Sequence, residues 1–271
     1  MKNTIKTILL FFTAALLITS CGEDSNPPTA GFSMSDMNPI QWGTSTIAST
    51  AIGADEISYS VSPSSHVWID AATIQFLEDT SYTITQTVLN EDGEDASSLT
   101  VVVTEPDNTY SIDGTSLPIT AAPSWVPANE AHETKALLHF ISDVEGQDEP
   151  NHIKLSPILG LDPLEGTYTY NSDKETIGTY YTRVISNFAG GVTDPSDWTT
   201  NFGGEDGGSD LVIELVYEDT DSPDNNAYEF TITSYILSTG HFDWSTFSFV
   251  EEAKRPFTLK YRGVVIPVVA P

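Results

Sequence analysis

Three tryptophans in predicted turns carry the parts of a sugar-binding site. Flat aromatic rings stack on apolar faces of a ligand, while neighbouring carboxylates accept hydrogen bonds from its hydroxyl groups. The rings are Trp125, Trp198 and Trp244, and the carboxylates beside two of them are Asp197 and Asp243. Each ring has a second interpretation, because a tryptophan at the end of a β-sandwich also closes the core. We treat the five residues as candidate ligand contacts.

Proline on both sides of Trp125 predicts a stiff loop. Pro123 and Pro127 have a fixed φ and no N–H for a sheet ladder. We therefore expect residues 123–127 to form a loop rather than a central strand.

An acidic loop between two predicted strands is a candidate calcium site. Residues 219–226 include Asp219, Asp221 and Asp224, and calcium takes six to eight oxygen ligands. The segment is not an EF-hand loop, because the glycine at position six is missing and Phe230 occupies position twelve. The other interpretation is a polar hairpin loop built of turn-forming residues. Calcium is the one cofactor that the sequence suggests.

Recognisable catalytic motifs are missing from the chain. There is no nucleophile elbow, no zinc-protease motif, no phosphate-binding glycine loop and no dinucleotide fingerprint. The five histidines are scattered without ligand spacing, and His139 is expected in the core or at its rim. A glycosidase needs only two suitably spaced carboxylates, yet no motif singles out a pair among the 39 acidic residues. The sequence thus predicts a protein without catalytic activity, with a glycan-active enzyme as the alternative.

The N-terminus has the pattern of a secretory signal. Lys2 and Lys6 are followed by an apolar run from Ile8 to Ile18 and then by small residues before Cys21, the one cysteine of the chain. The run is too short for a spanning helix, which needs about 20 apolar residues. We predict a signal peptide over residues 1–20.

Leu17-Ile-Thr-Ser-Cys21 resembles a bacterial lipobox. The resemblance implies cleavage before Cys21, acylation of its thiol and a lipid anchor, with residues 21–28 as a polar tether. Glu23 and Asp24 resemble the surface-export signal of Bacteroidota lipoproteins, although Gly22 is neutral. This implies the outer face of the outer membrane, with the periplasmic face as the alternative.

The charge of the chain excludes several partners. The formal net charge is −29 and becomes −31 when residues 1–20 leave with two lysines, and no Lys or Arg occurs between Cys21 and Thr134. Nucleic acid needs clustered cations, and so does an anionic membrane surface. The membrane is therefore reached through the lipid alone, and the remaining expected partner is a polysaccharide or an outer-membrane protein.

A β-hairpin is predicted in the first half of the chain. Tyr82, Ile84, Gln86 and Val88 alternate on one side of a strand, and the segment Asn90–Gly93 has hairpin-turn chemistry. The return strand is expected over residues 99–103.

Three segments, residues 28–33, residues 72–76 and this hairpin, resemble a PKD domain, an immunoglobulin-like β-sandwich. The match covers residues 28–104, and we assign the domain to residues 29–104. The Trp-x-Phe-Gly-Asp-Gly motif of that family is absent, and residues 58–62 stand in its place. The resemblance implies a spacer, or contacts with protein or polysaccharide.

A short linker, residues 105–109, is predicted before a larger all-β domain over residues 110–271. Repeated short strand patterns with Gly, Asp, Asn and Pro between them predict a second β-sandwich, jelly-roll-like or barrel-like. The expected strands cover residues 136–141, 153–159, 167–170, 180–186, 211–217, 228–235 and 257–266. In the strand over residues 211–217, Glu214 interrupts the second face, so we expect that face to be wet.

Residues 110–114, 166–170 and 257–263 resemble segments of the C-terminal β-sandwich of Bacteroidota surface lipoproteins. This resemblance implies a location rather than an activity. The resulting hypothesis is an outer-membrane surface lipoprotein that binds a glycan as an accessory in polysaccharide capture. The alternative is a protein-binding or structural subunit, or an adhesin, of a cell-surface complex.

Overall fold

The structure is a computed structural model that describes residues 25–70, 72–126, 137–143, 151–159, 164–170, 176–185, 198–200, 208–243, 245–246 and 248–267. The described residues are organised as β-strands, with a single turn of 3-10 helix at Pro223–Asn225. The predicted signal peptide and Cys21 lie outside the described residues. The predicted all-β fold class is confirmed.

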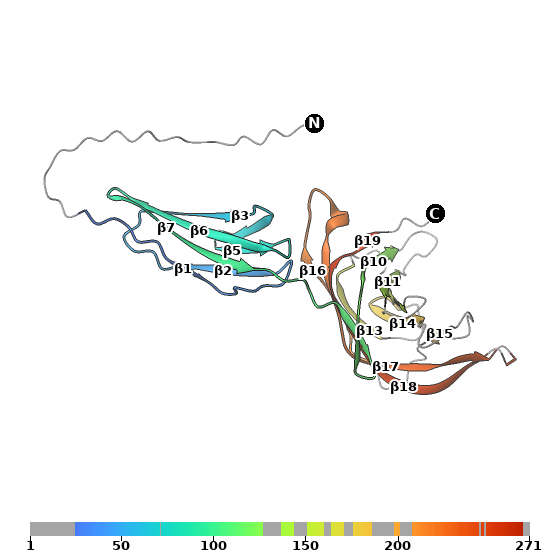
Figure 1. Cartoon of the computed structure of the whole chain (residues 1–271). Helices are drawn as coiled ribbons and strands as arrows, with labels where there is room; N and C mark the ends of the chain where they lie inside the picture. The colour runs from blue at the N-terminus through green and yellow to red at the C-terminus, as the bar shows by residue number, and fades with distance from the viewer. Residues whose placement is uncertain are drawn as a thin grey trace.

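The first part of the chain is a seven-stranded sandwich of two sheets (Figure 1). The four-stranded sheet has the order β1 (Phe32–Met34), β2 (Thr44–Ser49), β5 (Thr73–Phe76), β4 (His66–Asp70). The three-stranded sheet has the order β3 (Glu56–Ser62), β6 (Ser81–Asn90), β7 (Gly93–Val102). In immunoglobulin lettering these orders are ABED and CFG, the arrangement of a constant-type domain. The predicted immunoglobulin-like sandwich is confirmed by this topology.

The core of this sandwich uses the predicted face of β6. Tyr82, Ile84, Gln86 and Val88 are all fully buried, because alternate residues of a strand point to one side of its sheet. Ile84 and Tyr82 pack in a cluster with Phe76 of the opposite sheet. Burial of this apolar face therefore holds the two sheets together.

The turn between β6 and β7 is built as predicted. The side-chain oxygen Oδ1 of Asn90 accepts hydrogen bonds from the N–H groups of Asp92 (2.9 Å) and Gly93 (3.1 Å). Strand β7 begins at Gly93, six residues before the predicted start. Its first residues are polar and largely exposed at the edge of the sheet, so they show no apolar alternation.

The described residues of the second part of the chain form one twelve-stranded sheet. Its order is β19-β10-β11-β12-β14-β13-β16-β17-β18-β8-β9, and β15 pairs with β14 beside this path. The strands are β8 (Thr109–Ile112), β9 (Thr115–Pro118), β10 (Ala121–Val126), β11 (Leu137–Ser142), β12 (Asn151–Pro157), β13 (Gly166–Tyr170), β14 (Thr179–Ile185), β15 (Trp198–Thr200), β16 (Leu211–Tyr217), β17 (Ala227–Asp243), β18 (Ser248–Val264) and β19 (Ile266–Pro267). All seven strands predicted from residue 136 onward are present, with β17 and β18 longer than expected.

The sheet bends so that its two halves face each other across a shared core. The ring of Phe140, from β11, meets Phe230 of β17 at 5.6 Å and Tyr261 of β18 at 5.7 Å between centroids, in both cases edge to face. All three side chains are almost completely buried. The second sandwich is thus a single sheet folded over its own apolar face.

The hairpin of β8 and β9 closes with the residues that a tight turn requires. Asp113 and Gly114 have φ values of +52° and +76°, and two-residue hairpin turns with positive φ at both positions favour Asp-Gly. Strand β8 then pairs with β18, so this hairpin forms the end of the sheet beyond β17 and β18.

Candidate functional site

The outer face of the second sandwich is polar beside a buried apolar face. In β16, Leu211 and Ile213 are buried, whereas Glu214 between the apolar positions is exposed. In β13, Tyr168 is buried, and Thr167 is exposed. The expectation of a solvent-exposed face at Glu214 is confirmed, because one face of β16 packs on the core and the other faces solvent.

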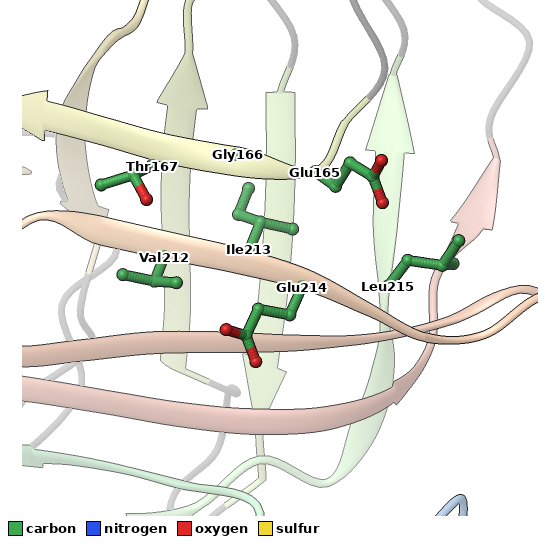
Figure 2. Close-up of a pocket in the computed structure, with 7 residues that line it drawn as sticks. All are labelled: Glu165, Gly166, Thr167, Val212, Ile213, Glu214 and Leu215. Carbon is green, nitrogen blue, oxygen red and sulfur yellow. The ribbon is translucent and has the colours of Figure 1, made fainter.

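An open groove of about 640 Å³ runs along this outer face. Figure 2 shows its lining residues on and beside the paired strands β13 and β16, with a carboxylate at Glu165 and another at Glu214. Its lining comprises Glu165, Gly166, Thr167, Val212, Ile213, Glu214 and Leu215. Two carboxylates and a hydroxyl thus stand beside short apolar side chains, a mixture typical of ligand sites.

The two carboxylates of the groove do not converge. In Figure 2, the side chain of Glu165, just before β13, and that of Glu214 on β16 extend in different directions. Glycoside hydrolysis requires two carboxyl groups that flank one bond. Glu165, Thr167 and Glu214 thus present separate oxygen acceptors at the groove.

Glu214 belongs to a charged row that crosses the sheet. It lies opposite Glu229 on β17, and Glu229 lies opposite Arg262 on β18. The Arg262 guanidinium donates a hydrogen bond from Nη1 to Oε2 of Glu229 at 2.8 Å. Like charges on directly opposite residues destabilise a sheet, and the Arg262 cation offsets this for Glu229. Glu214, in contrast, faces solvent at the groove.

Trp125 lies on strand β10, so the prediction of a loop is wrong for residues 123–126; Pro127 lies outside the described residues. Trp125 pairs with Leu138 of β11 on one side and with Pro267 of the parallel strand β19 on the other. The ladder with β11 shifts its register between Ala121 and Ser124, and this irregularity accommodates Pro123, which has no N–H to donate. The indole is half-buried and packs against the main core.

The remaining predicted ligand contacts are described only in part. Trp198 begins β15 opposite Ile185, and Asp243 ends β17 opposite Ser248, but their side chains lie outside the description. Asp197 and Trp244 lie outside the described residues altogether. Among the described residues, the lining of the groove includes none of the predicted contacts, and its one sequence signal was Glu214.

The three aspartates of the predicted calcium loop are not gathered around one point. Oδ1 of Asp219 accepts hydrogen bonds from the N–H groups of Asp221 and Ser222, both at 3.0 Å. Its Oδ2 accepts one from Nδ2 of Asn225 at 3.1 Å. These contacts lower the pKa of Asp219, with the Asn225 hydrogen bond as the largest cause. The carboxylate of Asp219 thus organises the turn.

Among the described residues, no group of three or more His, Cys, Asp or Glu side chains is arranged to hold a metal ion. The loop that contains Asp221 and Asp224 lies within those residues. The second interpretation of this segment, a polar hairpin loop, accounts for the hydrogen bonds that it makes.

Comparison with known proteins gives little further information. No family model matches the chain, and no curated protein matches it significantly. One solved chain, from a study of the specificity of carbohydrate-binding modules of the β-sandwich superfamily, is 12% identical and has a TM-score of 0.26. The comparison covers 90% of this chain and 94% of that one. Such a low TM-score supports no conclusion about ligand or activity.

The described residues contain no helix with the length and apolar character needed to cross a bilayer.

Proposed function

We propose that this protein is a lipid-anchored surface protein that binds a glycan without cleaving it. The groove lined by residues of β13 and β16 is the observation that carries the proposal. Glu165, Thr167 and Glu214 supply oxygen acceptors to its lining, and Val212 and Leu215 supply apolar side chains. An extended polysaccharide presents hydroxyl groups and apolar C–H faces in alternation, so a shallow groove with both kinds of contact suits it.

The anchor is proposed to be an acylated Cys21. The mature chain, with its net charge of −31 and no cation before Lys135, has no basic face for an anionic bilayer. Stable attachment then requires the lipid, and more than one acyl chain is needed for it. We place the protein on the outer face of the outer membrane, as the acidic residues after Cys21 suggest. Loss of fatty-acid labelling in Cys21→Ser tests the anchor, and protease accessibility in whole cells tests the face.

Electrophoresis of the mature chain through native gels that contain polysaccharides tests glycan binding. The protein carries Cys21→Ser to keep it soluble, and the gels cover a broad panel of polysaccharides. We expect at least one gel to retard the protein. Glu214→Gln and Glu165→Gln should each weaken retention about tenfold, since a hydrogen bond to a charged group contributes about 1.5 kcal/mol or more.

Glu94→Gln is the matched control for these variants. Glu94 is an exposed acid on β7 of the first sandwich, so its replacement changes the net charge equally and leaves the groove intact. If Glu94→Gln loses as much retention as the two groove variants, net charge alone decides migration. The groove would then be rejected as the binding site. Trp125→Ala, Trp198→Ala and Trp244→Ala, tested in the same gels, measure the predicted aromatic contacts.

Two further outcomes of this experiment redirect the proposal. If retention requires calcium, the loop over residues 219–226 would again be a candidate calcium site for glycan binding. No retardation in any gel would reject the glycan proposal. Co-purification of the lipidated protein with outer-membrane neighbours would then test the alternative, a protein-binding subunit or adhesin.

A further inference from the structure

The two sandwiches meet at a polar contact that joins residues far apart in the sequence. Nε2 of Gln75, on β5, donates a hydrogen bond to the carbonyl oxygen of Val216 at 2.6 Å. Nη2 of Arg262, on β18, donates one to the carbonyl oxygen of Trp42 at 2.9 Å. Each sandwich thus supplies one side-chain donor and one backbone acceptor. Figure 1 shows the end of the first sandwich meeting the second beside β16.

Local irregularities in the backbone present the two acceptors. The ladder between β16 and β17 changes register between Leu215 and Tyr217, so the carbonyl of Val216 is placed outside the regular pairing. Trp42 occupies the third position of a turn that Gly43 N–H closes onto the Ile40 carbonyl at 2.8 Å. Its φ is +59°, a conformation that favours Gly or Asn at this position of a turn. A bulky residue held there indicates strain maintained by its surroundings.

The surroundings of Trp42 hold this turn at both of its backbone groups. Its N–H donates a hydrogen bond to the Phe76 carbonyl at 2.7 Å. Its carbonyl oxygen accepts one from Gln75 Nε2 at 3.2 Å in addition to the one from Arg262. Gln75 is only 7% exposed, so its amide is enclosed between the two acceptors that it serves.

Arg262 is held in place on the other side. Its side chain is 15% exposed and pairs with Glu229 at 2.8 Å. Its backbone N–H donates a hydrogen bond to Oδ1 of Asn108 at 2.7 Å, and its carbonyl accepts one from Nδ2 of Asn108 at 3.1 Å. A guanidinium fixed by a carboxylate and a strand loses little freedom when it binds a further acceptor.

The linker between the two sandwiches is short, and both of its ends are fixed by hydrogen bonds. Thr104 is tied to the first sandwich, where its N–H donates to the Pro39 carbonyl at 3.1 Å and its carbonyl accepts from the N–H of Gln41 at 2.9 Å. Asn108 is tied to the second through Arg262. The residues between these ties are 105–107, and one of them is Pro106, which stiffens the connection.

We infer that the contacts of Gln75 and Arg262 form a clamp that holds the two sandwiches as one rigid unit. Relative motion is the default expectation for two domains on a short linker, and the clamp opposes it with two enclosed donors. Glu214 and Leu215, which line the groove, directly precede Val216 on β16. The first sandwich would then set the direction of the groove relative to the anchor, a consequence that rests on the proposed function.

Distances between two spin labels, measured by double electron–electron resonance, test the clamp. Cys21 is the one cysteine of the chain, so the mature chain with Cys21→Ser accepts labels at Thr100→Cys and Ser116→Cys alone. Thr100 is exposed on β7 and Ser116 on β9. We expect one narrow distance distribution for this parent. Arg262→Gln and Gln75→Leu should each about double its width, because the freed domains then move independently.

Arg255→Gln is the matched control. Arg255 is also on β18, but it pairs with Asp113 within the second sandwich at 3.4 Å and is 45% exposed. This variant should leave the distribution unchanged. If Arg262→Gln fails to fold, Gln75→Leu removes a clamp donor from the first sandwich and leaves β18 intact.

A broad distribution in the parent would overturn the clamp, and so would unchanged width in both clamp variants. Equal broadening in Arg255→Gln would overturn it as well, since the effect would then come from damage to β18. The measurement contains no glycan, so its failure leaves the result of the gel experiment unaffected.

Discussion

The hydroxyl of Tyr82 donates a 2.7 Å hydrogen bond to the carbonyl oxygen of Ser65, across the interior of the first sandwich. The same hydroxyl accepts a hydrogen bond from the N–H of Glu78 at 3.3 Å. Tyr82 lies near the start of β6, the sixth strand of the sandwich. A tyrosine at this place, bonded to backbone a few residues upstream, is the tyrosine corner of immunoglobulin-like folds. It ties the loop before β6 to the core.

Removal of this hydroxyl should destabilise the first sandwich. Tyr82→Phe leaves the Ser65 carbonyl and the Glu78 N–H without this partner, so we expect a loss of about 1–2 kcal/mol in the free energy of unfolding. Tyr170→Phe is the matched control, because the Tyr170 hydroxyl is buried with no hydrogen-bond partner in the described residues and its removal should be neutral or stabilising. Urea denaturation measures both. Equal losses of unfolding free energy in the two variants would contradict a stabilising role for the Tyr82 hydroxyl.

Gln86 is a fully buried polar residue of the first sandwich, and both polar atoms of its amide form hydrogen bonds. Oε1 accepts from the N–H of Gly31 at 2.8 Å, while Nε2 donates to Oγ of Ser49 at 2.9 Å and to the hydroxyl of Tyr59 at 2.8 Å. Gln86→Leu keeps the volume but leaves these groups unsatisfied, which should cost about 2–3 kcal/mol.

The exposed neighbour Thr83 on the same strand provides the comparison for Gln86. Thr83→Ala should change the free energy of unfolding by less than about 0.5 kcal/mol. Denaturation that shows Gln86→Leu to be as stable as the parent would mean that the hydrogen bonds of the amide contribute nothing net.

The turn at Asp219 should respond to acid. Its pKa lies below the ordinary 3.8 because of hydrogen bonds from Asn225, Ser222 and Asp221. A carboxyl with a lowered folded pKa stabilises the fold above its unfolded pKa, and this contribution is lost as the pH falls through the folded pKa. The turn should therefore persist at pH 4 and open only below the ordinary value.

Amide chemical shifts of Asp221 and Ser222 measure this transition. Both N–H groups donate to the Asp219 carboxylate, so their shifts should titrate together below 3.8. Asp219→Ala should abolish the titration, whereas Asp221→Ala should leave it in place at Ser222. A midpoint at or above the ordinary value would refute the hydrogen-bonded turn.

Gly208 lies against the ring of Tyr235, and no larger residue fits there. A Cβ at this position would overlap Cδ2 of Tyr235 and lie 2.9 Å from Cγ. Tyr235 is 2% exposed and packs on Tyr170 at 5.4 Å between ring centroids, so it has little room to move. Gly208→Ala should destabilise the second sandwich by about 1–3 kcal/mol.

A double-mutant cycle with Tyr235→Leu tests the cause. If the added methyl group acts by clashing with the Tyr235 ring, Gly208→Ala should lower the free energy of unfolding by about 1 kcal/mol less in the Tyr235→Leu background than in the parent. Additive losses would place the effect of the substitution elsewhere. Thermal or urea unfolding of the four proteins provides the free energies.

Local patterns were sufficient for the elements whose pairing is local. The alternation of Tyr82, Ile84, Gln86 and Val88 predicted the buried face of β6, and Asn90 with Gly93 predicted its turn. Glu214 predicted a wet face on β16. Each of these follows from the two-residue period of a strand or from turn chemistry, which a sequence displays directly.

Contacts between distant segments were decided by the tertiary structure alone. Trp125 became part of a strand because β10 pairs with β11 on one side and, more than a hundred residues later in the chain, with β19 on the other. The groove exists because β13 lies beside β16, and Gln75 reaches Val216 across 141 residues. No local period records which strands become neighbours, because that choice depends on how the whole apolar surface is buried. The sequence by itself determined two all-β parts and their polar faces, and folding determined where those faces meet.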